Sequence, residues 1–155
     1  MAPVNKANVL GIKVMESEAR LLIAVVDDDK SAGETLGRLL RAVGLHAETF
    51  VSGSEFLKWS RNHAPHCAVL DQDMPEMDGF EVQSQLAQTG ANVPVVMITG
   101  LPTPEARERA MEKGATAYLS KPVDAKVLLD TIATVIASAR GPRDNQVLNC
   151  RRLNR

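Results

Sequence analysis

The stretch Leu21-Leu22-Ile23-Ala24-Val25-Val26-Asp27-Asp28-Asp29 decides the fold of this chain. Six apolar residues, the length of a strand, end abruptly in three aspartates. Because the apolar run is continuous rather than alternating, it predicts a strand buried on both faces, as in a parallel sheet. The stretch therefore favours an α/β domain with helices on both sides of the sheet.

The same pattern recurs along the chain. Four further short segments predict strands at residues 46–51, 67–70, 93–99 and 117–120. Helical spacing and capping residues predict a helix after each strand, with starts at a Ser31/Glu34 capping box, at Ser52, near Phe80, at Thr103-Pro104 and at Asp124. Five strands that alternate with five helices predict an α/β fold with a doubly wound, five-stranded parallel sheet.

Composition and length set the class of protein. The 155 residues predict one domain, 45% of them are apolar and 24% charged, and the net charge of -1 argues against a nucleic-acid-binding surface. Two distant cysteines match no metal-binding spacing and suit a reducing compartment. No segment resembles a membrane span or a secretory signal, so we expect a cytoplasmic protein.

Three regions are expected along the chain. Residues 1–20 form an irregular N-terminal extension, either a genuine arm or, if the natural start is Met15, partly an upstream addition. Residues 21–140 form the domain. Residues 141–155 are polar and basic and form a tail, for which a solvated end is favoured over an arm that binds nucleic acid or a partner.

Polar side chains gather where the predicted strands end. The first strand ends in Asp27-Asp28-Asp29, the third in Asp71, the fourth in Thr99-Gly100 and the fifth in Lys121-Pro122. Ligands of open α/β sheets bind beyond these carboxyl ends. Each residue type alone is common at a strand end, but together they predict one site with carboxylates, a hydroxyl and an ammonium.

This set of groups indicates a chemistry. Carboxylates without histidine or thiolate neighbours favour Mg²⁺ or Mn²⁺. Lys121 offers a positive charge, and the Thr99 hydroxyl and the Gly100 backbone N–H offer hydrogen bonds, to a phosphoryl group. An aspartate among them can act as a nucleophile. The residues therefore predict metal-assisted phosphoryl transfer to a carboxylate.

Four stretches of the chain resemble those of response regulator receiver domains, the phosphoacceptor modules of two-component signalling, and are most similar to receivers of the nitrogen-fixation regulator type. They are Val25-Val26-Asp27-Asp28-Asp29, Val69-Leu70-Asp71-Gln72-Asp73-Met74-Pro75-Glu76-Met77-Asp78-Gly79, Val96-Met97-Ile98-Thr99-Gly100 and Gly114-Ala115-Thr116-Ala117-Tyr118-Leu119-Ser120-Lys121-Pro122. The resemblance covers residues 20–140. It implies the flavodoxin-like strand order 2-1-3-4-5.

The resemblance also implies roles for single residues. Asp71 would be the phosphoacceptor, and Asp28, Asp71 and the backbone carbonyl of Asp73 would ligate Mg²⁺, with Asp27 holding a coordinated water. The carboxylate of Asp73, an acid at a position where the family varies, would then lie at the rim of the site. Lys121 would pair with the phosphoryl group.

Two further residues would form the switch. Thr99 would turn toward the phosphoryl group and Tyr118 would swing inward behind it. The Lys121-Pro122 peptide would be cis, and the output face would comprise the fourth helix, fifth strand and fifth helix.

The implied function is that of a signalling protein rather than an ordinary enzyme. It would accept a phosphoryl group from a sensor histidine kinase or a histidine phosphotransfer protein and catalyse only its own phosphorylation and dephosphorylation. Its other partner would be an output protein or a missing output domain, with no membrane and no direct nucleic-acid binding by this domain.

Two other functions share part of this pattern. The D-x-D pattern of Asp71-Gln72-Asp73 also occurs in haloacid-dehalogenase-type phosphatases, but there it follows the first strand. A receiver-like interaction module that works without phosphorylation would usually lack one of the acids, the threonine or the lysine, and all are present here.

Overall fold

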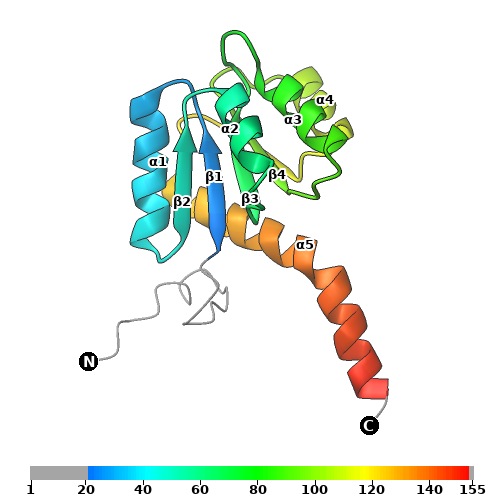
Figure 1. The fold of residues 1–155 in the computed structure, drawn as a ribbon. Helices are drawn as coiled ribbons and strands as arrows, with labels where there is room; N and C mark the ends of the chain where they lie inside the picture. Colours follow the sequence, from blue (N-terminus) through cyan, green and yellow to red (C-terminus); the bar gives the residue numbers. More distant parts are fainter. Residues whose placement is uncertain (1–20, 154–155) are drawn as a thin grey trace, which may run out of the picture.

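A computed structural model of the chain describes residues 21–153, and of residues 140–153 it describes only the backbone. Five strands alternate with five helices (Figure 1). In chain order the elements are β1 (Leu22–Val26), α1 (Lys30–Ala42), β2 (His46–Phe50), α2 (Gly53–Ser60), β3 (Cys67–Asp71), α3 (Gly79–Gln88), β4 (Val95–Thr99), α4 (Pro104–Glu112), β5 (Ala117–Ser120) and α5 (Ala125–Leu153).

The strands form one parallel sheet in the order β2-β1-β3-β4-β5. This confirms the predicted doubly wound α/β class and the 2-1-3-4-5 order. Because the chain passes from β2 at one edge to β3 beyond β1, the winding direction reverses between β1 and β3. The carboxyl ends of these two strands therefore flank the crevice where open α/β sheets bind ligands.

Two apolar layers cover the sheet, one on each face. Alternate residues of β1 point in opposite directions, with Ile23 and Val25 in the layer under α1 and α5, and Ala24 and Val26 in the layer under α2, α3 and α4. In Figure 1, α5 passes behind the sheet and α2 lies in front of it. Helices on both faces explain why the central strands β1, β3 and β4 are apolar at almost every position, whereas the edge strand β2 (HAETF) is partly polar.

The helix starts confirm most of the predicted caps. The side chains of Ser52, Thr103 and Asp124 each accept a hydrogen bond from a backbone N–H in the first turn of α2, α4 and α5. The Ser31/Glu34 box at the start of α1 was wrong. Asp29 caps this helix by accepting from the Ala32 N–H at 3.2 Å, and since α1 begins at Lys30, Ser31 lies inside its first turn.

The ends of the chain differ from the prediction in one respect. Helix α5 does not stop near residue 140 but continues to Leu153. The tail was predicted from its polar composition. The helix continues through Gly141-Pro142, a pair that disfavours a helix interior, and the arginine, glutamine and leucine residues beyond it are good helix formers. The expectation of an irregular extension at residues 1–20 lies outside the described residues. Within residues 21–153, none of the helices has the length and apolar character needed to cross a membrane.

Candidate functional site

Three aspartates meet at the carboxyl ends of the two central strands. Asp27 and Asp28 follow β1, and Asp71 is the last residue of β3. Each offers a carboxylate oxygen, and these oxygens lie within 4.8 Å of one another. Asp27 and Asp71 are buried whereas Asp28 is exposed, so the cluster opens to solvent on the side of Asp28.

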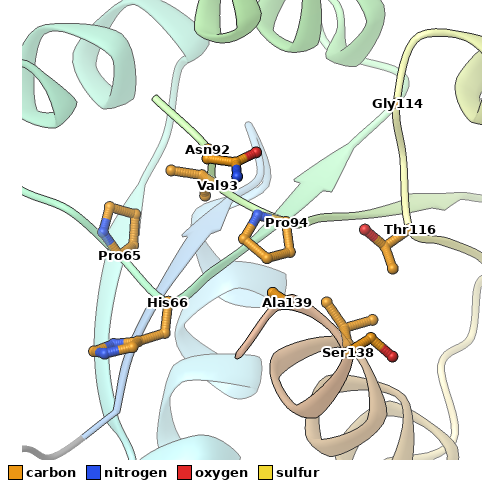
Figure 2. A pocket seen from close by; sticks show the side chains of 10 residues that line it. Pro65, His66, Asn92, Val93, Pro94, Gly114, Thr116, Ser138 and Ala139 are labelled. Carbon is orange, nitrogen blue, oxygen red and sulfur yellow. The ribbon is translucent and has the colours of Figure 1, made fainter. Parts of the chain in front are cut away.

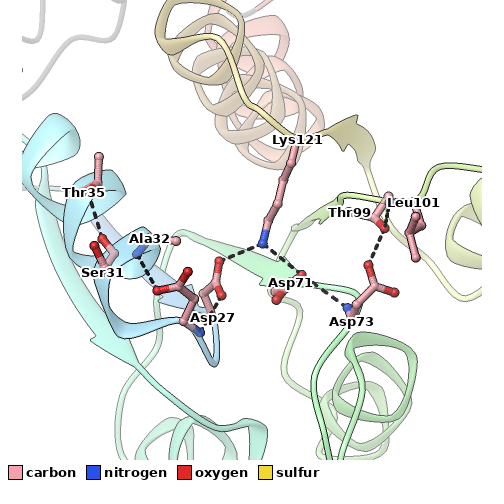
Figure 3. A network of polar contacts seen from close by, with 10 residues as sticks. Asp27, Ser31, Ala32, Thr35, Asp71, Asp73, Thr99, Leu101 and Lys121 are labelled. Atoms are coloured by element: carbon pink, nitrogen blue, oxygen red, sulfur yellow. Dashed lines mark hydrogen bonds and ion pairs between the residues drawn. The ribbon is translucent and has the colours of Figure 1, made fainter.

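Lys121 joins this cluster from the end of β5. Its Nζ lies 3.1 Å from Oδ2 of Asp27 and 3.3 Å from Oδ1 of Asp71 (Figure 3). The peptide bond that follows it, Lys121-Pro122, is cis, as expected. One ammonium among three carboxylates leaves two net negative charges when every group is ionised.

The charges shift the pKa values of the groups they surround. Burial and then the charge of Asp27 raise the pKa of Asp71 from 3.8 to about 7, although Lys121 acts in the opposite direction. Burial lowers the pKa of Lys121, but its hydrogen bond to Asp27 and the charge of Asp71 outweigh that effect and raise it. The site therefore favours the charged form of Lys121 and disfavours the ionised form of Asp71, unless a further cation approaches.

The contacts of the carboxylates indicate which of them can bind a cation directly. Both oxygens of Asp27 are engaged, Oδ1 by the Asp29 N–H at 2.9 Å and Oδ2 by Lys121. The contacts of Asp71 with Lys121 and the Asp73 N–H both run to Oδ1. The second oxygen of Asp71 and the exposed Asp28 carboxylate suit direct coordination, and Asp27 suits an outer position. Oxygen donors without nitrogen or sulfur fit Mg²⁺.

Thr99 and Asp73 form a second part of the site. Thr99, the last residue of β4, is fully buried, and its hydroxyl donates to Oδ2 of Asp73 at 2.6 Å. The same hydroxyl oxygen accepts the Leu101 N–H at 3.0 Å. Asp73 is exposed at the rim, as expected, but its carboxylate contacts Thr99 from there.

Tyr118 lies behind Thr99 in the structure. Only 8% of its surface is exposed, and its hydroxyl donates to Oε1 of Gln72 at 2.7 Å. Gln72 in turn donates from Nε2 to Oδ1 of Asp73 at 3.2 Å. The inward position that was expected for Tyr118 after activation is therefore already occupied here.

A hollow lies at the opposite end of the sheet, between α5 and the segments that lead into β3, β4 and β5 (Figure 2). Its volume is about 480 Å³, and its walls include Pro65, Val93, Pro94 and Ala139. None of its lining residues is an acid, a lysine or an arginine. The hollow therefore lacks the groups for metal or phosphoryl chemistry that the acidic cluster has.

The sequence profile of the response regulator receiver domain matches residues 23–133. This chain belongs to that family. The match spans β1 through most of α5, so it includes the acidic cluster, Thr99 and Lys121.

Named relatives of this receiver include response regulators. It is 35% identical over 135 residues to the response regulator protein TodT of Pseudomonas putida, covering 87% of this chain and 59% of that protein. It is 34% identical to nodulation protein W of Bradyrhizobium diazoefficiens, covering 84% of this chain and 58% of that protein. The chain thus spans less than two thirds of the length of these relatives.

Solved structures agree with the fold. The response regulator StyR is 36% identical with a TM-score of 0.69, covering 86% of this chain and 67% of that one. The chemotaxis protein CheY4 of Vibrio cholerae is 28% identical with a TM-score of 0.73, covering 76% of this receiver and 99% of that chain.

The receiver site contains the residues predicted for it, in two groups. Asp27, Asp28, Asp71 and Lys121 surround one space, while Thr99 contacts Asp73 beside it. Gly100 follows Thr99 directly and is exposed. Sequence reasoning missed Gln72, which is only 8% exposed and joins Tyr118 to Asp73. The one available signal was its place between two acids, and that says nothing about its partners.

Proposed function

We propose that this receiver accepts a phosphoryl group on Asp71 from a sensor histidine kinase or a histidine phosphotransfer protein. The observation that carries the proposal is the position of the Lys121 ammonium between Asp27 and Asp71, beside a third carboxylate. Lys121 is placed to balance a transferred phosphoryl group. Family membership supports the same function.

The donor set fits a divalent cation at this site. The carboxylates of Asp28 and Asp71 and the backbone carbonyl of Asp73 would hold Mg²⁺, or Mn²⁺ in its place, and Asp27 would hold a water bound to it. When bound, the cation offsets the negative charge of the carboxylates and of the incoming phosphoryl group.

The protein groups carry out the transfer by position and charge. An oxygen of Asp71 forms a bond to phosphorus while the bond from phosphorus to the donor's imidazole nitrogen breaks. The imidazole leaves with the electron pair and is protonated from solvent, and Asp71 becomes an acyl phosphate. The phosphoryl oxygens then pair with the Lys121 ammonium and accept hydrogen bonds from the Thr99 hydroxyl and the Gly100 N–H.

The output of this reaction is a change of a docking surface. When Thr99 turns to the phosphoryl group, its contacts with neighbouring groups change. The position of the Tyr118 side chain on β5 changes as a result. The surface of α4, β5 and α5 would then bind or release an output protein or output domain. Cytoplasmic localisation, and the absence of membrane or nucleic-acid binding by this domain, remain parts of the proposal.

The function is tested by weighing the intact protein after incubation with Mg²⁺ and acetyl phosphate. We expect an adduct with the mass of one phosphoryl group in the native protein and in Asp130→Asn, which alters an exposed aspartate on α5. Asp71→Asn should give none. An adduct that survives Asp71→Asn would refute the acceptor. No adduct in the native protein would favour the phosphorylation-independent module, and turnover of a phosphate monoester would favour the phosphatase.

A further inference from the structure

Three hydrogen bonds join β4, the segment after β3, and β5 into one chain of contacts. The Thr99 hydroxyl donates to Oδ2 of Asp73 at 2.6 Å, the Gln72 amide donates to Oδ1 of the same carboxylate at 3.2 Å, and Tyr118 donates to Gln72 at 2.7 Å. Asp73 therefore accepts from Thr99 on one oxygen and is linked to Tyr118 through the other.

The hydrogen bond between Thr99 and Asp73 is short and charge-assisted. A hydroxyl that donates to a carboxylate at 2.5–2.7 Å forms a charge-assisted bond, roughly twice as strong as a neutral one. Thr99 is fully buried, so water does not readily replace Asp73 as its acceptor. A hydroxyl has one proton to donate. Thr99 therefore cannot donate a hydrogen bond to Asp73 and to a phosphoryl oxygen at the same time.

The position of Gln72 makes the link to Tyr118 specific. Gln72 is 8% exposed, its carbonyl oxygen accepts from Tyr118, and its amide donates to Asp73. These two contacts fix the orientation of the side-chain amide, because the reverse orientation would turn its carbonyl oxygen toward the Asp73 carboxylate, which can only accept, and would leave Tyr118 without its acceptor. A change in the position of the Asp73 carboxylate is therefore transmitted to Tyr118.

We propose that Asp73 is an internal acceptor that holds the Thr99 hydroxyl before phosphorylation, and that Gln72 couples this contact to the inward position of Tyr118. The inference rests on the proposed function and concerns its regulation. Asp73 and Gln72 are positioning residues: they set the resting arrangement of the switch without contacting the transferred group through their side chains. Asp73 competes with the phosphoryl group for Thr99 and at the same time holds Tyr118 inward.

The competition is tested with beryllofluoride, a phosphoryl analogue, at saturating Mg²⁺. Isothermal titration should show that Asp73→Ala binds it about ten-fold more tightly than the native protein, the equivalent of about 1.4 kcal/mol. Loss of the negative charge at the rim would by itself also raise the affinity for an anion. To separate this effect from the competition, Asp73→Ala is also made in the Thr99→Ala background. In the Thr99→Ala background, Asp73→Ala should raise the beryllofluoride affinity less than about two-fold. The reason is that the hydroxyl for which Asp73 and the phosphoryl analogue compete is no longer present.

A second variant separates the hydrogen bond from the charge. Asp73→Asn removes the charge but keeps an oxygen that can accept from Thr99. We expect its affinity to lie between those of the native protein and Asp73→Ala. Equal gains in Asp73→Asn and Asp73→Ala, or equal gains with and without Thr99, would overturn the competition and leave a purely electrostatic effect.

The coupling to Tyr118 is tested without any phosphoryl analogue. Tyr118 is the single tyrosine of the chain, so 3-fluorotyrosine labels one position and gives one ¹⁹F resonance. Asp73→Ala should shift that resonance in the resting protein. In Gln72→Met, which has a similar volume but neither a donor nor an acceptor of this kind, the same Asp73→Ala substitution should shift it far less. An equal shift in both backgrounds would refute the role of Gln72.

The two experiments distinguish failure of the inference from failure of the proposed function. If the native protein binds no beryllofluoride, the phosphoacceptor function is refuted, and the competition with it. If the native protein binds it but Asp73→Ala changes neither the affinity nor the ¹⁹F resonance, only the inference is wrong.

Discussion

Replacing Asp71 with asparagine should stabilise the metal-free protein against unfolding. Asp71 is buried, and its carboxylate lies near those of Asp27 and Asp28. Asparagine keeps the shape and an oxygen acceptor for the Lys121 ammonium but removes the charge. The substitution should therefore relieve both the desolvation of the carboxylate and its repulsion with Asp27, the two largest causes of its raised pKa.

The size of the effect follows from the pKa of Asp71. A rise from 3.8 to about 7 spans about three pKa units, and at about 1.36 kcal/mol per unit this sets an upper limit of about 4 kcal/mol. The cluster opens to solvent at Asp28, and the Lys121 side chain is 31% exposed, so water screens part of the repulsion. We expect Asp71→Asn to raise the free energy of unfolding by about 2 kcal/mol at pH 8.

The effect should depend on pH with a definite sign. A carboxyl whose pKa is higher in the folded protein binds more protons there, so its contribution to the free energy of unfolding falls as pH rises. For Asp71 that fall extends from the unfolded pKa of 3.8 to the folded value of about 7. The difference between Asp71→Asn and the native protein should therefore be small at pH 4, increase through pH 5–7, and level off at pH 8.

The measurement is urea denaturation of both proteins in EDTA at several pH values. Asp130→Asn, which removes an exposed aspartate charge on α5, controls for net charge. Added Mg²⁺ should narrow the gap between Asp71→Asn and the native protein, because a dication offsets the same repulsion. This account of the site would be refuted if the difference in free energy of unfolding between the two proteins did not change with pH. It would also be refuted if Asp71→Asn were less stable than the native protein at pH 8.

Two further predictions concern Gly79 and Tyr118. Gly79→Ala should lower the free energy of unfolding, measured in urea, by about 1–3 kcal/mol, because its Cβ would lie 2.7 Å from the Asp71 carbonyl oxygen. Gly33→Ala is the control: its Cβ would meet nothing closer than 3.8 Å, so the substitution should be neutral or stabilising. Equal effects of the two substitutions would contradict the steric reason. Burial and then the charge of Asp73 raise the pKa of Tyr118, so Asp73→Asn should lower it in an ultraviolet titration of this single tyrosine, and an unchanged pKa would refute the contribution of Asp73.

The fold was predictable because its central strands are buried on both faces. Each central strand appears in the sequence as a short apolar run, and polar capping residues such as Ser52, Thr103 and Asp124 mark the helices between the strands. The start of α1 was less certain in sequence because Asp29 and Ser31 are both good capping residues. The length of α5 was missed because a polar composition does not by itself prevent helix formation.

The acidic cluster was predictable for a topological reason. Parallel strands place the residues that follow them at one edge of the sheet, so Asp27, Asp71, Thr99 and Lys121 could be grouped without knowledge of side-chain geometry. The chain of contacts through Gln72 could not be predicted from the sequence. It depends on the path of the segment between β3 and α3, where Glu76 has a positive φ of 66°, and no hydrophobic period encodes such a path.

The charges of the site explain why the proposed acceptor Asp73 can release Thr99. With every group ionised, three carboxylates and Lys121 sum to two negative charges, which a bound dication would cancel. A phosphoryl group on Asp71 replaces one carboxylate charge with about two, so the loaded site again becomes negative. The Asp73 carboxylate is then beside a more highly charged anion and is repelled by it. Because Asp73 is exposed, it can move into water at little cost, whereas the buried Thr99 hydroxyl must find another acceptor, and the phosphoryl oxygens supply one.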